Sequence, residues 1–455
     1  MSHYTNSVFI FRRDLRLQDN TGLNEALRLS KHVLPCFIVD PRQIEPHPYQ
    51  SKPALQFMLQ CLIDLQQQLQ TVGAELGLYQ ALPVQVISQL VEQQAIQAVF
   101  INRDYTPFSR QRDDELDKLC KELGINLHIL NDSLLTEPEQ ALKSDRTPYK
   151  VFTAFYNNAR QFPVALPHVL YSQSFLLPQT SSNIEDFGLS LAEIKANVLQ
   201  GGRNQALAML ATLMQQTDYQ NSRDYPALDS TSKLSAHLKF GTCSVREAYY
   251  AIVDALGSEH PLLRQLYWRD FFTHIAYHFP MVFGRAFIDK FANLPWDNNR
   301  DYFQAWAEGK TGFPIVDAGM RELNETGFMH NRVRMIVASF LVKDLHVSWR
   351  WGERYFAQHL IDYDPCVNNG NWQWAASTGC DAQPYFRIFN PWLQQQKFDA
   401  DCQYIYHWLP ELKGFSTKTI HQWYKKHQPC NYPTPIIDHA YESQLSKARY
   451  KASMD

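Results

Sequence analysis

One face of the segment 329–346 carries an amide, a guanidinium and a thioether at helical spacing. Asn331, Arg334 and Met335 stand at i, i+3 and i+4, and the small Ala338 follows. These groups can bond the edge of a planar polar ligand and pack against its face. A polar helix face closed by a salt bridge is the simpler alternative.

A second segment, 265–279, places an indole beside another amide and guanidinium. Gln265, Trp268 and Arg269 fall on one helical stripe with Phe272. This combination suits a pocket that stacks a nucleobase and bonds its edge. A tryptophan that simply packs on an arginine fits the pattern equally well.

The segment 360–391 is the densest in polar and aromatic side chains. We expect a ligand site here, because a core rarely holds so many polar groups and a solvated loop rarely holds two indoles. No metal is expected, since a hard-cation loop offers oxygen ligands at alternate positions without bulky neighbours. The residues concerned are Asp362, Asp364, Asn368, Asn369, Gly370, Trp372 and Trp374.

The hydroxyl-rich sequence TSKLS at 231–235 resembles a helix N-terminus. Free backbone amides at such an end can hold a phosphate group, and a plain N-cap is the alternative. No GxSxG or HExxH pattern accompanies these segments. Hydrolytic chemistry is therefore disfavoured.

The first 130 residues predict an α/β domain. Their alternation of apolar runs and helical patterns predicts a doubly wound parallel five-stranded sheet covered on both faces. The runs lie at 8–11, 33–39, 75–79, 98–101 and 127–130, and the helical patterns at 21–30, 54–70, 84–93 and 110–123. Neither GxGxxG nor GxxxxGK[ST] occurs, so no standard dinucleotide or P-loop site is predicted.

The remaining chain predicts a proline-rich connector at 131–200 and a large all-α domain at 201–455. All ten tryptophans lie at or beyond residue 268. Such a composition is expected of a domain that handles planar ligands, although large helical cores also use tryptophan. A buried helical stripe is predicted from Val333, Ile336, Val337, Phe340 and Leu341.

The composition limits the class of protein. The 455 residues are 45% hydrophobic and lack an apolar run long enough for a signal peptide or a membrane span. We therefore expect a soluble, cytoplasmic protein. The eight scattered cysteines have no metal-ligand spacing and are predicted to be reduced core thiols. With a net charge of -3, any DNA-binding face depends on local clustering of basic residues.

Several longer motifs resemble the photolyase and cryptochrome family. The similarity runs end to end and is strongest between residues 311 and 392. MHNRVRM resembles the class I cyclobutane pyrimidine dimer photolyases, because six-four photolyases carry a pair of histidines in the corresponding stretch. The motifs are FRRDLRLQDNTGL, TSKLSAHLKFG, WRDFF, GKTGFPIVDAGMRELNETGFMHNRVRMIVASFLVKDL, WRWGERYFAQHLIDYD and NNGNWQWAASTGCDAQPYFRIFNP.

The resemblance implies an antenna-chromophore domain at 1–130 and an FAD-binding catalytic domain at 201–455. Asn368 would face flavin N5, where a neutral amide favours the reduced flavin. Trp296, Trp349 and Trp372 resemble the chain of indoles that carries electrons from the surface to the flavin. The other residues that the resemblance assigns to FAD are Tyr219, Thr231, Ser232, Lys233, Leu234, Ser235, Arg269, Asn331, Arg334, Asp362 and Asp364.

The implied activity is light-dependent DNA repair. Excited reduced FAD would give an electron to a flipped-out cyclobutane pyrimidine dimer, which splits into two pyrimidines and returns the electron. The partner would be ultraviolet-damaged DNA, single- or double-stranded, bound by a monomer with no obligate protein partner and no membrane. The residues implied at the lesion and the DNA are Arg223, Gln265, Trp268, Asn331, Arg332, Met335, Trp374 and Gln394. A cryptochrome-type blue-light photoreceptor and a six-four photolyase are the alternatives.

Two positions depart from the class I pattern. Gln265 stands where these enzymes usually have a glutamate that bonds the dimer bases. Glutamine can donate and accept but cannot supply a proton, so we expect less efficient repair or a preference that drifts toward six-four lesions. Phe108 and Ser109 replace the Asn-Glu pair associated with a folate antenna. A folate, a deazaflavin, a second flavin and no antenna all remain open.

Overall fold

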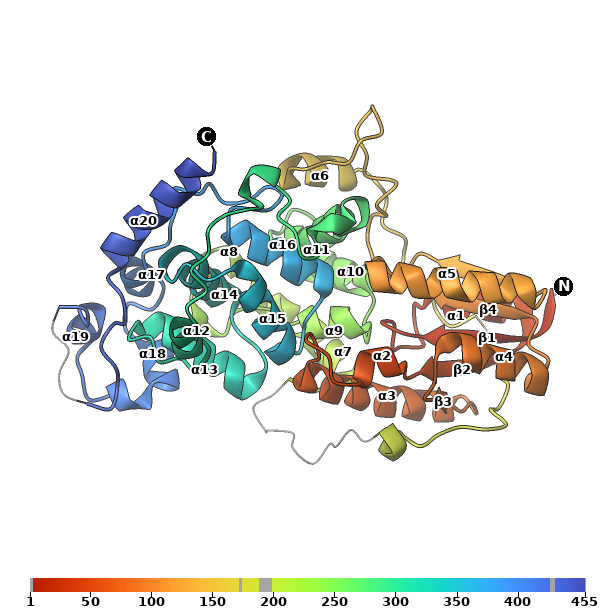
Figure 1. Ribbon diagram of the computed structural model, residues 1–455. Coiled ribbons are helices and arrows are strands. Elements are labelled where there is room, and N and C mark those ends of the chain that lie inside the picture. Colours follow the sequence, from red (N-terminus) through yellow and green to blue (C-terminus); the bar gives the residue numbers. More distant parts are fainter. Residues whose placement is uncertain (1–2, 172–173, 188–198, 426–429, 455) are drawn as a thin grey trace. The chain divides into compact units, whose positions relative to one another are not determined.

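The computed structural model describes residues 3–171, 174–187, 199–425 and 430–454. Its first part contains a parallel five-stranded sheet in the order β3-β2-β1-β4-β5 (Figure 1). The predicted α/β fold with a doubly wound sheet is confirmed. The strands are β1 (Tyr4–Phe11), β2 (Ser30–Ile38), β3 (Gly77–Tyr79), β4 (Ala98–Asn102) and β5 (Asn126–Leu130).

Helices connect the strands on both faces of the sheet (Figure 1). Right-handed crossovers put the connections before and after β3 on opposite faces, because the strand order reverses there. β3 is shorter than the predicted run at 75–79, since it pairs only with the last three residues of β2, Cys36, Phe37 and Ile38. The connecting helices are α1 (Thr21–Leu29), α2 (Pro41–Ile44), α3 (Lys52–Thr71), α4 (Pro83–Gln94) and α5 (Pro107–Glu122).

Packing divides the chain into two compact units. The first unit comprises Met1–Thr217 and Ser232–Pro280, and the second comprises Asp218–Thr231 and Met281–Asp455. The helices of residues 232–280 thus pack with the sheet, so this division does not follow the predicted borders at 130 and 200, which stay predictions. Besides α1 to α5, the first unit includes α6 (Phe152–Ala159), α7 (Arg203–Ala211), α9 (Ser235–Phe240), α10 (Val245–Leu256) and α11 (Leu263–His278).

Buried ion pairs explain why α10 belongs to the first unit. Arg246, near the start of α10, bonds Asp19 at 2.9 Å and Asp132 at 2.8 Å. Arg16 bonds the other oxygen of Asp132 at 2.7 Å. These charged side chains are at most 9% exposed. Removing one partner would leave a buried charge unpaired, which costs several kcal/mol. The pairs therefore hold α10 against the loops that follow β1 and β5.

The second unit is helical, and most of its helices pack around a large apolar core. The predicted stripe is confirmed, because Val333, Ile336, Val337, Phe340 and Leu341 are at most 1% exposed. The segment 329–346 is not one regular helix, however, since α14 passes into a π-helical turn, η6 (Phe340–Asp344). The helices are α8 (Tyr219–Ser222), α12 (Arg300–Ala307), α13 (Pro314–Thr326), α14 (Asn331–Ser339), α15 (Trp349–His359), α16 (Pro365–Ala375), α17 (Pro391–Phe398), α18 (Gln403–Trp408), α19 (Thr417–His421) and α20 (His439–Ala452).

A glycine sets the distance between α13 and α14. A Cβ on Gly319 would lie 2.3 Å from Cγ1 of Val333 and 3.1 Å from Cγ1 of Val337. Carbon atoms in contact normally stay about 3.5–4.0 Å apart. The close approach of the two helices therefore requires a residue without a side chain at 319.

Seven of the cysteines are buried, as predicted, and all eight are free thiols. Cys430 is exposed, so its prediction as a core thiol is wrong. It lies outside any helix or strand, where no core covers it. None of the helices in the described ranges is long and apolar enough to cross a membrane.

Candidate functional site

The predicted site residues fall in both units, and the second unit holds most of them. On α14, the Arg334 guanidinium donates to both carboxylate oxygens of Asp362 at 3.1 and 3.0 Å. Its Nε donates to the Met329 carbonyl at 2.7 Å. The salt bridge that the polar face suggested is therefore present, and it fixes the orientation of Asp362, whose side chain is 5% exposed. A bidentate pair of this kind gives geometric precision as well as energy.

Asp364 begins α16. Its side chain accepts hydrogen bonds from the backbone N–H groups of Cys366 at 2.9 Å and Val367 at 3.1 Å. Pro365 follows as the first residue of the helix, where its missing N–H is not needed. The N-cap fixes the start of the helix that carries Asn368 and Trp372.

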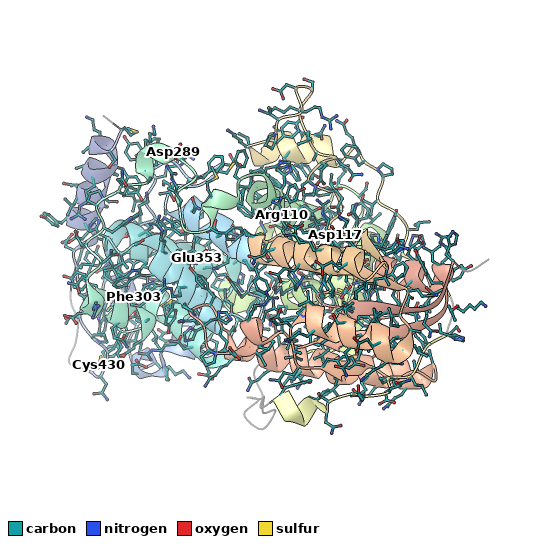
Figure 2. All side chains as sticks on the ribbon, turned by 45° about the vertical axis from the view of Figure 1, so that its right-hand side comes forward. Arg110, Asp117, Asp289, Phe303, Glu353 and Cys430 are labelled. Carbon is teal, nitrogen blue, oxygen red and sulfur yellow. The ribbon has the colours of Figure 1, made fainter. Side chains whose placement is uncertain are left out.

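Asn368 is buried on α16, and its amide nitrogen donates to the Glu353 carbonyl at 3.0 Å. This bond orients the amide and leaves its carbonyl oxygen as an acceptor for an N–H group of a ligand. Figure 2 labels Glu353 in the second unit, on the neighbouring helix α15. A fixed amide of this kind is the arrangement expected for the residue at flavin N5.

The next polar residues of α16 have structural partners. Asn369 donates to the Val282 carbonyl and to the Glu353 carboxylate, each at 3.0 Å. Gln373 donates to the Val282 carbonyl at 3.0 Å and to the Arg285 carbonyl at 3.1 Å. Both side chains are 1% exposed. The expectation that so many polar groups exclude a core is therefore wrong for Asn369, because satisfied hydrogen bonds offset the cost of burying a polar group.

The predicted electron-carrying tryptophans differ in burial. Trp372 and Trp349 are 2% and 1% exposed. Trp296 is only partly buried and packs against Phe291, Leu294 and Tyr450. Two buried indoles and one partly exposed indole match the order expected of a path from the interior to the surface. The edge of the Trp372 ring lies against Gly352, where any Cβ would come within 2.1 Å of it.

The lesion residues of the second unit lie nearer the surface. Asn331 is exposed, and its amide nitrogen lies 3.8 Å from the Met335 sulfur. Met335 and Trp374 are partly buried. Arg332 bonds Asp224 at 2.7 Å, and its guanidinium lies 4.4 Å from the centre of the Phe398 ring. Arg332 therefore has a fixed position.

Residues 219–231 also belong to the second unit. Tyr219 is 7% exposed, and the Arg223 guanidinium lies 5.6 Å from the centre of its ring. The prediction that 231–235 leads into a helix N-terminus is confirmed, because α9 begins at Ser235, whereas the alternative of a plain hydroxyl N-cap is wrong. Helix α9 begins at Ser235 with Leu234 at the cap position, where no side-chain bond is made. Lys233, two residues before the first residue of α9, adopts the left-handed conformation with φ +51°. The regular helical backbone therefore begins only after it.

Several buried polar atoms of the second unit lack a hydrogen-bond partner among the described residues. In this described part of the chain, the eight unpartnered side-chain atoms are Ser230 Oγ, His330 Nε2, Arg332 Nε, Asp344 Oδ2, Thr378 Oγ1, Gln394 Oε1, Gln395 Oε1 and Ser446 Oγ. An unsatisfied buried polar group costs about 1–3 kcal/mol. Burial also lowers the pKa of His330 to about 4, so its ring is neutral at working pH. The Asp362 carboxylate and the Asn368 amide oxygen can accept hydrogen bonds from the hydroxyl and N–H groups of a cofactor such as FAD.

The predicted site residues of the first unit lie on α11. Trp268 stacks on Phe152 with ring centres 3.7 Å apart and planes at 7°. One face of the indole is thus covered, which leaves at most the other face for a base. Arg269 donates to the Ser133 carbonyl at 2.5 Å and to the Leu238 carbonyl at 3.5 Å. Arg269 therefore connects the segment that follows β5 to α9. These hydrogen bonds explain its position without packing on Trp268. Gln265, one turn earlier, is partly buried.

Asp270 is a buried carboxyl that the motif analysis missed. It accepts from the backbone N–H groups of Leu135 at 2.8 Å and Thr136 at 3.1 Å. Burial raises its pKa to about 7, although nearby Arg269 opposes the shift. The motif WRDFF gave no signal that Asp270 is buried and hydrogen-bonded. Its partners Leu135 and Thr136 lie 135 and 134 residues earlier in the chain.

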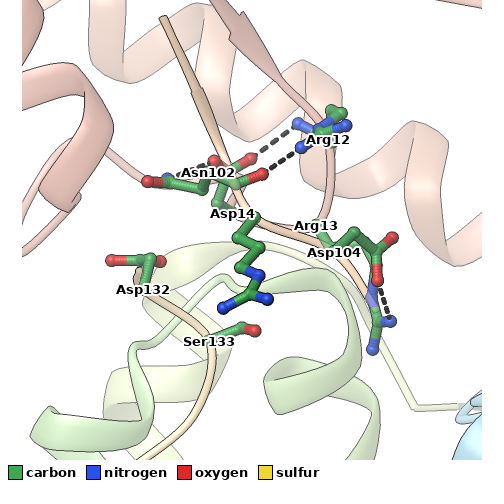
Figure 3. Close-up of a pocket in the computed structure, with 8 residues that line it drawn as sticks. Arg12, Arg13, Asp14, Asn102, Asp104, Asp132 and Ser133 are labelled. Carbon is green, nitrogen blue, oxygen red and sulfur yellow. Dashed lines mark hydrogen bonds and ion pairs between the residues drawn. The ribbon is translucent and has the colours of Figure 1, made fainter. Parts of the chain in front are cut away.

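The carboxyl ends of β1 and β4 surround a small cavity (Figure 3). Asn102 donates to Asp14 at 2.5 Å, and Arg13 pairs with Asp104 at 3.2 Å. Burial raises the pKa of Asp14 to about 6. The pKa of Asp104 is lowered, because Arg13 and its neighbours outweigh burial. The cavity measures about 10 Å³, room for about one water molecule. Internal ion pairs therefore fill this edge, where ligands of such sheets usually bind.

The antenna positions lie on α5. Ser109 is buried, and its hydroxyl bonds Thr106 and Asp104, each at 2.8 Å. Phe108 lies under the Arg42 guanidinium, 5.1 Å from the ring centre. Arg42 is in turn bonded to Asp40 at 2.7 Å. Ser109 is thus used inside the protein, and the described residues contain no group of three or more His, Cys, Asp or Glu that could hold a metal ion.

Comparison with known proteins identifies the family. Residues 7–170 match the DNA photolyase model, and residues 262–452 match the FAD binding domain of DNA photolyase. A deoxyribodipyrimidine photo-lyase of Synechococcus sp. is 38% identical over 97% of this chain and 96% of its own length.

Two solved structures share the fold over almost the whole chain. An archaeal photolyase from Sulfolobus tokodaii, which holds two FAD molecules, is 44% identical with a TM-score of 0.91 and covers 98% of this chain and 100% of its own. A cryptochrome of Synechocystis sp. is 30% identical with a TM-score of 0.88 and covers 98% of this chain and 100% of its own. The predicted all-α character of the second part is consistent with both. The chain therefore belongs to the DNA photolyase family and contains its FAD-binding domain.

Proposed function

We propose that this protein is a deoxyribodipyrimidine photo-lyase that splits cyclobutane pyrimidine dimers in ultraviolet-damaged DNA when it absorbs light. The observation that carries the proposal is the pairing of Asn368 and Trp372 on one face of α16, four residues apart and both buried. Together they supply a planar redox cofactor with a fixed neutral amide and a nearby electron donor. Named relatives with this activity at 38% identity support the same function.

FAD supplies the light-driven electron transfer when it is bound. We propose that the ion pair of Arg334 and Asp362 holds the cofactor at a defined place, because a bidentate pair cannot rotate without losing both bonds. Asn368 would accept from a flavin N–H with its carbonyl oxygen. The further residues proposed to contact FAD are Tyr219, Thr231, Ser232, Lys233, Leu234, Ser235, Arg269, Asn331 and Asp364.

Trp372, Trp349 and Trp296 are proposed to pass electrons inward from the surface. The increase in exposure from Trp349 to Trp296 supports this direction. Electron hopping needs no proton acceptor while the indoles stay cationic, so this route does not require a base beside each ring. The role remains distinct from repair itself, since it prepares the reduced cofactor.

The lesion end is proposed to use side chains that can adapt to a distorted base pair. Asn331 offers an amide to the base edges, and Met335 a polarizable thioether to their faces. Trp268 has one free face at most for stacking. Arg332, positioned by Asp224, faces the backbone or the lesion with a fixed guanidinium. Trp374, Arg223 and Gln394 complete the proposed set, with Gln265.

DNA affinity is proposed to come mainly from phosphate contacts, so it should fall with rising salt. The lesion itself reduces the cost of extrusion, because a damaged base pair is already weakly stacked. We propose that the protein acts as a monomer without an obligate protein partner and inside the cell, where its DNA substrate lies.

The antenna is proposed to be a flavin. Ser109 is engaged internally, which disfavours a folate pocket built on that position. The Arg42 guanidinium lies 5.1 Å from the centre of the Phe108 ring and pairs with Asp40 and Glu115. The Sulfolobus tokodaii photolyase holds two FAD molecules. Identification of the small molecules released by acid from the purified protein distinguishes a second flavin from folate, deazaflavin or no antenna.

The test of the main proposal uses the purified full-length protein loaded with FAD. The cofactor is reduced with dithionite, and an oligonucleotide with one defined thymine dimer is exposed to blue light. We expect dimer loss in light to exceed the dark control. Equal loss in light and dark would overturn the repair function. If the same protein binds FAD and responds to light but leaves both thymine dimers and six-four lesions unchanged, the cryptochrome alternative stands, which the Synechocystis relative makes the second candidate.

A further inference from the structure

Trp372 has a second tryptophan neighbour outside the predicted chain of indoles. Its ring centre lies 6.2 Å from that of Trp306, with the planes at 74°. Trp306, on α12, is fully buried. The Phe356 ring packs beside both, with its centre 4.9 Å from that of Trp372 and 6.3 Å from that of Trp306. The two indoles are thus close enough for electron exchange without another residue in the path.

The aromatic contacts continue outward from Trp306. Its ring centre lies 5.5 Å from that of Tyr355 on α15, and 5.8 Å from that of Phe303. Figure 2 labels Phe303 in the second unit. Phe303 also contacts Trp351 at 5.2 Å. Tyr355 and Trp351 are both partly exposed. This cluster therefore leads from Trp372 toward solvent.

Tyr355 differs from its neighbours because it can release a proton. Its hydroxyl lies 2.7 Å from the Asn324 amide oxygen and 3.0 Å from the Ala307 carbonyl, and donates to one of them. Burial raises the pKa of Tyr355 to about 12, with the negative charge of Glu308 adding to the shift. The phenol is therefore neutral at working pH and keeps its proton until it is oxidised.

We propose that Trp306 and Tyr355 form a second route by which an electron reaches Trp372 from the protein surface. The inference rests on the proposed function, because it starts from a Trp372 that has lost one electron in a light-driven step. Trp306 gives one electron to Trp372 and becomes a cation. Tyr355, which is partly exposed, then gives one electron to Trp306 and its phenolic proton to water. The neutral tyrosyl radical regains an electron and a proton from an external thiol.

The direction of this transfer follows from the surroundings of Trp306. Its indole N–H donates to the Val337 carbonyl at 3.0 Å, which cannot take up the proton. A cation there would remain charged in a fully buried position, which is costly. Transfer to Tyr355 removes that charge from the core, because the phenol loses its proton as it is oxidised. A phenyl ring is much harder to oxidise than an indole or a phenol, so Phe303 cannot carry the electron hole. It acts only as a packing contact between Trp306 and Trp351.

The test uses full-length protein with oxidised FAD and ring-deuterated tyrosine. After a light flash, electron paramagnetic resonance should show a tyrosyl radical whose signal narrows with deuteration. The signal should vanish in Tyr355→Phe and persist in the matched control Tyr406→Phe. The Tyr406 hydroxyl also donates to a backbone carbonyl, that of Phe415, at 2.8 Å. Tyr355→Phe keeps the ring and its packing, so it is chosen over replacement of the fully buried Trp306.

A second measurement isolates the route. Trp349→Phe interrupts the predicted chain of indoles. We expect this variant to retain part of the light-driven reduction of FAD through the second route. The double variant with Tyr355→Phe should lose what remains. An absent tyrosyl signal, or equal rates in the single and double variants with unchanged circular dichroism, would overturn the second route. Repair by dithionite-reduced protein does not need either route. Failure of that repair counts against the proposed function alone, and failure of the radical assay against the second route alone.

Discussion

Replacement of Gly319 by alanine tests how α13 positions the helix that carries Asn331, Arg334 and Met335. In an exposed helix the change would stabilise the protein by about 1 kcal/mol, because glycine is a poor helix former. Here the new Cβ would lie 2.3 Å from Cγ1 of Val333. That is more than 1 Å inside a normal carbon contact.

Val333 cannot relieve this clash at low cost. It is fully buried, and a β-branched side chain in a helix has one strongly preferred rotamer. Overpacking of a core costs about 1–3 kcal/mol. The clash therefore outweighs or cancels the gain in propensity, and we expect a net loss of up to about 2 kcal/mol. For a unit of this size, each kcal/mol corresponds to a melting temperature lower by about 2–4 °C.

The assay is thermal unfolding of the FAD-loaded protein, with FAD retention after gel filtration as a second readout. Gly414→Ala is the matched control, because a Cβ there would meet nothing within 4 Å. The double variant Gly319→Ala with Val333→Ala should be less destabilised than the sum of its parts, by about 0.5–3 kcal/mol. A Gly319→Ala protein as stable as Gly414→Ala, or strict additivity in the double variant, would refute the packing argument.

Three further predictions concern the site and its surroundings. Gln265→Glu should raise the yield of dimer repair per absorbed photon, because it restores a carboxyl that can bond the bases, and an unchanged yield would show that the carboxyl is dispensable here. Asp362→Asn removes one charge of the pair with Arg334 and should weaken FAD binding about tenfold, for a loss of about 1.5 kcal/mol in a charged hydrogen bond. Fluorescence titration of the apoprotein checks this, with the exposed pair partner Asp289→Asn as control. The third prediction concerns acid stability. Burial lowers the pKa of His237 to about 4, from 6.5 in the unfolded chain. The folded state therefore binds fewer protons between pH 6.5 and 4, and the stability linked to this group is lost as pH falls through that window. His237→Gln should lower stability at pH 7.5, and its deficit should shrink toward pH 5 by up to about 1.4 kcal/mol per pH unit. Urea midpoints at both pH values measure this, and a deficit independent of pH would contradict the assignment.

The sequence alone was sufficient for features that depend on local periodicity. Strands such as β1 followed from continuous apolar runs, and the helices between them followed from helical patterns of residues adjacent in the chain. The buried stripe with Val333 and Val337 followed from the helical repeat, since a helix brings residues three and four apart to one face. The motifs between 311 and 392 were sufficient to indicate the photolyase and cryptochrome family, because they are long and specific runs of adjacent residues.

The tertiary structure decided which partner each side chain took. Trp268 stacks on Phe152, more than a hundred residues earlier, and no local pattern indicates that choice. The buried pairs of Arg246 with Asp19 and Asp132 assign α10 to the unit of the sheet. Trp306 contacts Trp372 only because α12 and α16 pack together. Periodicity defines the face of an element, but the identity of the opposing face depends on contacts between distant segments, which the order of residues does not reveal.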